Sequence, residues 1–317
     1  MKVIRMNFIP TIHVTADNIP QAHYRATKAV FEEGLEIRTQ YDRKEGDKFI
    51  DPPSKDARAL IFVKNPFNQP RYPRISYCEI GKYIAEIVGV KDHLVVPFEE
   101  LKMGLETGNL STLWPYTYSQ RLMAHPLESG RTLNQLDALV DRIAENPITR
   151  RAVAMTGVPE IDNKLKEDMP CLRELHLRGI EEDGTTYLQM STVWRSRDLF
   201  KAWPDNVIAI TFLQSELVRR LKEKTGKNWE VGSYSDYSTS LHLYGQDIKE
   251  KGVVKYVEQG EREALSKAMN SSLASECLVI PQLESLLLED EQWKFREPQK
   301  CLIKKLISDI RAGKAVA

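Results

Sequence analysis

The sequence has little of what marks several large classes of protein. It contains four cysteines in 317 residues, and none of them forms a CxxC pair. The chain therefore predicts neither a disulfide framework nor a zinc ribbon. Its six histidines show no metal-ligand spacing with a cysteine or a carboxylate. We expect reduced thiols, which are typical of a cytoplasmic protein, and no bound metal.

Charge of one sign is not in excess, because 45 basic side chains match 45 acidic ones. A balanced chain lacks the positive field that attracts a nucleic-acid backbone or an anionic membrane, so we expect neither as a partner. The start of the chain has no long apolar run with a small-residue cleavage site, and no later run reaches membrane-spanning length. The sequence therefore predicts a cytoplasmic protein that binds any anionic ligand through a local cluster of arginines.

Glycine-rich phosphate loops of the Rossmann or Walker kind are also missing, which disfavours dinucleotide enzymes and kinases. The composition is that of an ordinary globular protein, with 42% hydrophobic and 28% charged residues. A chain of this length forms one large domain or two ordinary ones. We expect a single catalytic domain over residues 1–317, in which 248–317 is a helical C-terminal elaboration.

Hydrophobic periodicity predicts an α+β fold, in which helices pack against a mixed sheet. Helical spacing appears in four segments: 19–34, 80–90, 133–145 and 207–224. Strand patterns appear in four others: 57–63, 172–178, 187–194 and 229–243. Glu182-Asp183-Gly184 separates two of these strands and predicts a hairpin turn.

Three short blocks mix apolar residues with polar groups that a core does not ordinarily contain. They are 168–172, 194–206 and 240–244. Cys171, in the first block, follows a proline where a strand begins, and a nearby arginine, Arg173 or Arg195, would favour its thiolate. Most isolated cysteines are small buried hydrophobes, so Cys171 alone does not decide the function.

The other polar residues each allow a structural and a ligand-binding interpretation. Guanidinium groups suit bidentate phosphate binding, although Arg150-Arg151 taken alone is better explained as a solvated charge pair. Asn206 is either a helix cap or a ligand contact. His242 and Tyr244 lie two apart on a strand, so they face the same way, toward a ligand or within a core.

Taken in order, these blocks resemble the thymidylate synthase family, which includes the pyrimidine nucleotide hydroxymethylases. Pro170-Cys171 is similar to the family's Pro-Cys nucleophile, and His242-x-Tyr244 to its His-x-Tyr strand. Residues 195–206 resemble the Arg-Ser-x-Asp…Pro-Phe-Asn signature, and 145–151 the Asp-Pro-x-x-Arg-Arg turn. Within 195–206, the tripeptide Ala-Trp-Pro resembles the archaeal and hydroxymethylase branches of the family more than the common bacterial branch.

The resemblance implies a homodimer through a mixed sheet, and one-carbon transfer from the cosubstrate methylenetetrahydrofolate to a pyrimidine nucleoside monophosphate. The thiolate of Cys171 would add to carbon 6 of the base and so make carbon 5 nucleophilic. Glu86, with Glu79 as the alternative, matches the glutamate that acts through water as general acid and base. Tyr118 matches the tyrosine beside the cysteine that helps to remove the carbon 5 proton.

The remaining implied roles are binding roles. Arg195 and Ser196 would hold the substrate phosphate, together with the mobile arginine that Arg43 resembles. Arg150 and Arg151 would reach the same phosphate from the partner subunit.

By the same resemblance, His242 and Tyr244 would hold the sugar of the nucleotide. Asn206 would pair with the edge of the base through its amide donor and acceptor. Asp198 would contact the pterin of the folate.

Two departures from the family pattern bear on the product. Leu172 stands where many members have a histidine, and the tryptophan-rich segment that shields the methylene intermediate is not recognisable between Glu86 and Tyr118. A less shielded intermediate is attacked by water rather than by hydride. We therefore expect 5-hydroxymethylation of dUMP, with reductive methylation to thymidylate, or hydroxymethylation of dCMP or CMP, as alternatives.

Two rival classes stay open from the sequence. A noncatalytic nucleotide-binding relative would keep the arginines without needing Cys171. A cysteine hydrolase would need a histidine base beside Cys171, either His176 or His242.

Overall fold

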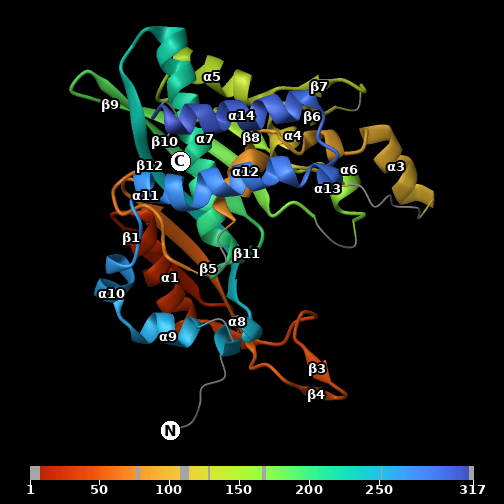
Figure 1. Ribbon diagram of the computed structural model, residues 1–317, viewed down its shortest axis with the longest axis vertical. Helices are drawn as coiled ribbons and strands as arrows, with labels where there is room; N and C mark the ends of the chain where they lie inside the picture. Colours follow the sequence, from red (N-terminus) through yellow and green to blue (C-terminus); the bar gives the residue numbers. More distant parts are fainter. Residues whose placement is uncertain are drawn as a thin grey trace. The chain divides into compact units, whose positions relative to one another are not determined.

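The computed structural model describes residues 8–75, 79–107, 114–127, 129–165, 169–250 and 252–313, the side chains of Asp290 and Glu291 excepted. Cys78 and Asp168 lie outside the described residues. The chain divides into two compact units (Figure 1). Unit 1 comprises residues 1–78, 193–207 and 233–270, and unit 2 comprises 79–192, 208–232 and 271–317.

Unit 1 is built around β5 (Ser54–Val63), which contains the predicted strand 57–63. On one side β1 (Thr11–Ala16) pairs with it in parallel, and on the other β12 (Trp229–Leu243) pairs with it antiparallel. β2 (Leu35–Ile37) is antiparallel to the start of β5, and β11 (Arg197–Asp198) is parallel to β12. Parallel and antiparallel pairs therefore occur together, which confirms the predicted mixed sheet.

Helix α1 (Ile19–Glu33) covers β1 and β5, as Figure 1 shows. Alternate residues of β1 are buried, because one face of the strand lies against the helix. Asn18 caps α1 by accepting a hydrogen bond from the Gln21 amide, and the helix ends before Gly34. The predicted helix 19–34 is confirmed.

Three short helices follow β12 in unit 1, and a small two-stranded arm completes it. The helices are α8 (Gly245–Glu250), α9 (Val253–Glu258) and α10 (Glu261–Ser266), of which α9 and α10 pack on α1. The arm pairs β3 (Lys44–Glu45) with β4 (Lys48–Phe49) and stands out in Figure 1.

Unit 2 contains the predicted hairpin. β9 (Leu172–Glu182) turns into β10 (Thr185–Trp194) through Asp183 and Gly184, whose φ angles are 49° and 76°. Positive φ at both central residues matches the right-handed twist of a hairpin, which explains the Asp-Gly pair. β8 (Val153–Met155) is antiparallel to β9, and α5 (Gln135–Glu145) packs on both strands.

The long helix α7 (Ala202–Thr225) begins five residues before the predicted 207–224 and stops, as expected, at Gly226 with φ 65°. Its later residues in unit 2 contact the sheet, where the Gln214 amide donates to the Leu188 carbonyl at 2.7 Å.

The other elements of unit 2 are short, and several belong to the C-terminal region. Before β8 come α2 (Ile80–Ile87), the 3-10 helix η1 (Asp92–Leu94), α3 (Phe98–Thr107), α4 (Tyr118–Met123), β6 (His125–Pro126) and β7 (Thr132–Leu133). After it come α6 (Pro159–Asp162), α11 (Ser271–Ala274), the π-helix η2 (Ser275–Val279), α12 (Ile280–Leu288), α13 (Asp290–Trp293) and α14 (Glu297–Arg311). Within the described ranges, no helix is both long enough and apolar enough to cross a bilayer.

Candidate active site

Cys171 immediately precedes β9 in unit 2 and is half-buried. Its backbone amide donates to the Tyr118 hydroxyl oxygen at 3.1 Å, and the amide of Leu172 donates to the same oxygen at 3.2 Å. The Cys171 thiol is not part of a disulfide, and its Sγ lies 4.0 Å from the Met169 carbonyl oxygen. The tyrosine that the sequence places beside the cysteine is therefore in direct contact with the cysteine backbone.

Tyr118 is held in place by the capping of its own helix. Thr117, the N-cap of α4, accepts a hydrogen bond from the Gln120 amide. The Asp92 carboxylate accepts from the hydroxyls of Thr117 and Ser119, which flank the tyrosine on both sides. Burial, and then the nearby Cys171, raise the pKa of the Tyr118 hydroxyl. Tyr118 therefore keeps its proton at neutral pH.

An arginine pair around Asp162 supports the turn that carries Cys171. Asp162 is fully buried and accepts from Arg121 at 2.8 Å, and Arg173 lies 3.6 Å from its other oxygen. Arg173 also donates to the Pro170 carbonyl at 3.4 Å. Within unit 2, Arg173 is thus the cation that stands at the Pro-Cys turn. Arg121 has no counterpart among the sequence predictions, because only burial distinguishes it from a surface arginine.

Glu86 lies in the last turn of α2, with 18% of its side chain exposed. Burial raises the pKa of its carboxyl group, and the Lys91 ammonium, 3.3 Å from Oε2, opposes that rise. The alternative, Glu79, precedes α2, has 70% of its side chain exposed and contacts Lys82. Of the two carboxyl groups, Glu86 is thus the buried one with a raised pKa, which is typical of groups that exchange protons in catalysis.

Unit 1 holds a buried cation that the sequence did not single out. The Arg197 guanidinium is 1% exposed, lies 2.7 Å from the Asp236 carboxylate and stacks 3.8 Å from the Trp194 ring centre. The Trp203 indole donates to the same carboxylate at 3.1 Å. Burial raises the pKa of Asp236, and Arg197 opposes the rise. In the sequence, this residue could have been found as the second arginine of Arg-Ser-Arg-Asp. Its partner Asp236 is an aspartate within the strand β12.

Asn206 is not a helix cap, because α7 already begins at Ala202. Its side chain is buried, and Oδ1 accepts a hydrogen bond from Arg197 Nε at 3.3 Å. An arginine Nε always donates, so the amide oxygen, not the amide nitrogen, faces Arg197. The capping interpretation is therefore wrong, and the orientation of the amide is fixed by a neighbour.

The other residues of the signature lie on either side of Arg197. Arg195 and Ser196 are half-buried after the end of β10, where Thr239 donates to the Arg195 carbonyl at 2.5 Å. Asp198 accepts from the amides of Phe200 and Lys201, each at 3.1 Å. Its carboxylate thus shapes the turn that leads into α7.

His242 and Tyr244 lie at the end of β12 with ring centres 4.6 Å apart. His242 Nδ1 is 3.4 Å from the Ser240 hydroxyl, which donates to Asp56 at 2.9 Å. Burial lowers the pKa of His242, although Asp198 and Asp56 oppose this. A cavity of about 330 Å³ opens beside Tyr244, and its lining residues are Tyr41, Asp42, Lys201, Tyr244, Gly245 and Gln246.

The arginines proposed for phosphate differ in how they are paired. Arg43 binds Asp51 through two hydrogen bonds of 2.8 and 2.6 Å and contacts Glu250 at 2.5 Å, so its charge is already compensated. Arg150 and Arg151 precede β8 and are exposed. Among the described residues, no carboxylate forms an ion pair with either of them.

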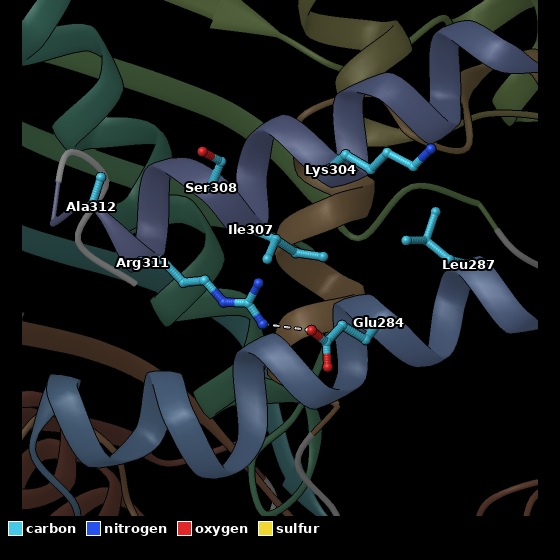
Figure 2. Close-up of a pocket in the computed structure, with 7 residues that line it drawn as sticks. All are labelled: Glu284, Leu287, Lys304, Ile307, Ser308, Arg311 and Ala312. Carbon is cyan, nitrogen blue, oxygen red and sulfur yellow. Dashed lines mark hydrogen bonds and ion pairs between the residues drawn. The ribbon is translucent and has the colours of Figure 1, made fainter.

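A hollow of unit 2 is lined by none of the predicted site residues. It measures about 610 Å³ and lies between α12 and α14, with Leu287 and Ile307 inside and the Arg311–Glu284 ion pair of 2.6 Å at one end (Figure 2). In the part of the chain that the structure describes, no three His, Cys, Asp or Glu side chains gather as metal ligands.

Comparison with known proteins adds a family to this geometry. The family profile described as thymidylate synthase matches residues 103–284, which is more than half of the chain. The chain belongs to the thymidylate synthase family. Members of that family transfer a one-carbon group from methylenetetrahydrofolate to a pyrimidine nucleotide, so the protein is a one-carbon transferase.

Archaeal relatives that carry the provisional name thymidylate synthase agree with this assignment. The protein of Methanosarcina barkeri is 32% identical over 151 residues, which span 47% of this chain and 62% of the relative. That of Methanosarcina mazei is 26% identical over 74% of this chain and 90% of its own. That of Methanopyrus kandleri is 32% identical over 62% of this chain and 80% of its own.

A solved structure confirms the fold class. Thermostable thymidylate synthase A from Bacillus subtilis superposes with a TM-score of 0.50 at 18% identity, over 76% of this chain and 84% of that one. The α+β class with a mixed sheet and covering helices is therefore confirmed, as is the resemblance to the family.

Proposed function

We propose that the protein transfers the one-carbon group of methylenetetrahydrofolate to carbon 5 of dUMP through a covalent adduct on Cys171. The observation that carries the proposal is the contact of the Tyr118 hydroxyl with the backbone of Cys171. The negative charge of Glu86 contributes to the raised pKa of the same tyrosine, after burial and Cys171. A nucleophile, a protonated hydroxyl and a carboxyl group with a raised pKa supply the groups that addition and proton removal require.

The proposed steps use each of these groups once. The Cys171 thiolate bonds to carbon 6, and the electrons of the carbon 5–carbon 6 double bond form a bond from carbon 5 to the folate-borne carbon as one folate carbon–nitrogen bond opens. The carbon 5 proton passes to a water molecule oriented by the Tyr118 hydroxyl, and Glu86 exchanges protons with the base through water. Loss of that proton breaks the second folate carbon–nitrogen bond, which releases tetrahydrofolate and leaves an exocyclic methylene group. Water adds to the methylene group, the carbon 5–carbon 6 double bond reforms and the thiolate leaves, so the enzyme is regenerated.

Asn206 supports uracil as the base. Arg197 holds the Oδ1 atom, and the amide carries one acceptor and one donor, which match the ring N–H and a carbonyl oxygen of uracil. We therefore place dUMP before dCMP and CMP as the substrate.

The proposed homodimer through the sheet has support within each unit. In unit 1, Leu60 and Tyr237 are paired across β5 and β12, and both are at least 36% exposed. In unit 2, Val153 and Met155 of β8 are exposed apolar residues that follow the exposed Arg150-Arg151. An apolar sheet face next to exposed arginines suits a partner subunit whose phosphate site these arginines complete.

The other binding roles stay as the resemblance implies them: Arg195 and Ser196 on the phosphate, His242 and Tyr244 on the sugar, and Asp198 on the pterin. Arg43 would have to leave Asp51 and Glu250 to reach a phosphate. A single catalytic domain, with 248–317 as its elaboration, and a cytoplasmic location remain predictions.

For the product we put 5-hydroxymethyl-dUMP first, because Leu172 replaces the usual histidine and the tryptophan-rich segment that shields the methylene intermediate is not recognisable between Glu86 and Tyr118. Thymidylate is the second candidate. It is favoured by Trp114 and Trp293, which lie near this pair and provide aromatic surface, and by the names of the archaeal relatives.

The experiment incubates the protein with methylenetetrahydrofolate and each of dUMP, dCMP and CMP, and identifies the products by mass. We expect 5-hydroxymethyl-dUMP with release of tetrahydrofolate. The exposed Cys277→Ser variant is the matched control and should behave as the parent protein. Thymidylate with dihydrofolate would select the second candidate, and no product from any nucleotide would favour the noncatalytic relative.

A rival cysteine hydrolase gains no support from the described residues of unit 2. His176 lies five residues beyond Cys171 along β9, roughly 17 Å for an extended strand. Its Nε2 is 2.8 Å from the Glu174 carboxylate, on its own strand.

A further inference from the structure

The C-terminal helices of unit 2 pack directly on the helix that carries Glu86. The Gly81 amide of α2 donates to the Gln282 side chain of α12 at 2.7 Å. A Cβ atom at Gly81 would lie 2.5 Å from the Val279 carbonyl oxygen, so only glycine allows this approach. Lys82, the next residue, forms an ion pair of 3.0 Å with Glu289 at the end of α12.

Lys91 follows α2 and lies between two tryptophans. Its Nζ is 4.8 Å from the ring centre of Trp114 and 4.4 Å from that of Trp293, while 3.3 Å separates it from Glu86 Oε2. Only 9% of the lysine side chain is exposed. A shielded ammonium group beside two aromatic rings is attracted to both, and the Glu86 carboxylate is its close counter-ion.

Trp293 is held in place by hydrogen bonds and by a ring contact of its own. Its indole N–H donates to Glu289 at 2.9 Å, and its carbonyl oxygen lies 2.8 Å from His93 Nε2. The ring meets Trp114 edge-on, with centres 5.8 Å apart. Glu289, whose pKa is lowered to about 2 by Trp293 and Lys82, stays charged and keeps the indole in position.

We propose that the C-terminal region is part of the catalytic machinery: Trp293 and Trp114 clamp Lys91, and Lys91 is the positioning residue that holds the Glu86 carboxylate as its counter-ion. This inference rests on the proposed function, which gives Glu86 its role. It also assigns a purpose to α12 and α13, for which the sequence offered no chemical motif.

The charges around Glu86 make the proposal measurable. Burial and the Asp92 carboxylate both disfavour the ionised form of Glu86, and Lys91 favours it. Tyr118 is a further titratable group that interacts electrostatically with it. On the helices packed against α2, Glu289 is paired with Lys82, and Glu284 with Arg311. Loss of Lys91 therefore removes the cation that, within the described part of the chain, favours an ionised Glu86.

The test measures the pH dependence of kcat and kcat/KM with dUMP and methylenetetrahydrofolate for four variants. In Lys91→Met we expect the acidic limb to move up by about one pH unit and kcat to fall about 100-fold. Lys91→Arg keeps the cation and should recover most of the activity. Trp293→Leu should lower kcat roughly tenfold while KM for dUMP changes little, because only the clamp is lost. Leu288→Ala, at a residue that is 88% exposed, is the matched control in the same region.

Two results separate this proposal from the function on which it rests. If the parent protein forms no covalent adduct with 5-fluoro-dUMP and methylenetetrahydrofolate, the proposed function fails. If the adduct forms but Lys91→Met and Trp293→Leu keep the parent pH profile and kcat, the proposed role of Lys91 and the two tryptophans is refuted, while the proposed function stands. Should Lys91→Met not fold, Lys91→Gln and Trp293→Leu decide by the same profile, and unchanged kinetics in either overturns the proposal.

Discussion

The two units hold their predicted site residues by different physical means. In unit 2, Cys171 is held by its backbone, which donates to the Tyr118 hydroxyl, and Tyr118 is held by the cap of α4. In unit 1, Asn206 is held by a buried ion pair, Arg197 with Asp236, which is sealed by tryptophan rings. The backbone of Cys171 thus depends on hydrogen bonds to a neutral hydroxyl, and the Asn206 amide depends on a buried ion pair.

This difference predicts where each unit is sensitive. A neutral hydrogen bond contributes little net free energy, so a conservative change near the nucleophile should alter chemistry more than folding. A buried charge that loses its partner is strongly destabilising, so changes in unit 1 should affect folding first.

The largest expected effect is the replacement of the nucleophile. Cys171→Ser should lower kcat for dUMP by more than about 10⁴-fold, because the covalent intermediate is lost. Serine is close to cysteine in size and the thiol is only half-buried, so the midpoint of urea unfolding should hardly move. Steady-state kinetics and urea titrations on the same preparation check both halves of the prediction. A variant that retains a tenth of the activity would show that Cys171 is not the nucleophile.

The second prediction concerns the buried pair of unit 1. Asp236→Asn leaves the Arg197 charge in the interior without its counter-ion and should cost about 3–5 kcal/mol of unfolding free energy. Chemical denaturation measures the loss. The double variant Arg197→Met/Asp236→Leu removes both charges and should be less damaging to stability than the single change. A single variant as stable as the parent would remove the contrast between the units.

How much of the fold the sequence could predict depends on whether local or long-range interactions determine each element. Residues 19–34, 57–63 and the Asp183-Gly184 turn were predicted because local periodicity and turn chemistry determine them. The start of α7 at Ala202 was missed, because the apolar residues before Val207 do not continue the periodic face and the Pro204 region suggested a boundary. Tertiary contacts there override the local signal.

The site could be predicted only where a motif was present. Cys171 and Asn206 were predicted from short blocks and Tyr118 from the family resemblance, whereas the contacts of Arg197, Lys91 and Trp293 are visible only in the three-dimensional structure. Lys91 and Trp293 are some 200 positions apart in the sequence, and nothing local links a lysine after a helix to a tryptophan near the C-terminus. The orientation of the Asn206 amide likewise depends on a neighbour and not on its own residue type.

The third prediction concerns the sensitivity of unit 1 to acid, which a buried histidine should increase. His23, buried in unit 1 against Tyr256 and Trp203, has its pKa lowered from 6.5 to about 4 by burial. The unfolded chain therefore binds this proton first as the pH falls, so the free energy of unfolding should decrease between about pH 6.5 and 4, by up to about 3 kcal/mol. Above pH 6.5 the group is neutral in both states and contributes no slope.

His23→Gln should flatten this slope relative to the parent protein. Urea unfolding at several pH values gives the comparison, and the difference between the two proteins isolates His23 from carboxyl groups that titrate in the same range. Parallel pH profiles for the two proteins would contradict the lowered pKa.

A smaller cost in stability than that of Asp236→Asn is expected beside Cys171. Tyr118→Phe removes the oxygen that accepts from the amides of Cys171 and Leu172, and it should cost about 1–3 kcal/mol. Catalysis should suffer more, with kcat lowered about 10²-fold through the loss of the hydroxyl that serves proton removal. Thermal unfolding and kinetics on one variant compare the two costs. Full activity in Tyr118→Phe would remove the tyrosine from the mechanism.

The central claim is that the Cys171 sulfur bonds to carbon 6 of a uracil nucleotide. The direct measurement is mass spectrometry of the protein after incubation with 5-fluoro-dUMP and methylenetetrahydrofolate, followed by digestion to locate the added mass. The account predicts a stable ternary adduct on the peptide that contains Cys171. An unmodified Cys171 peptide, or an adduct on Cys277 or Cys301 instead, would contradict it.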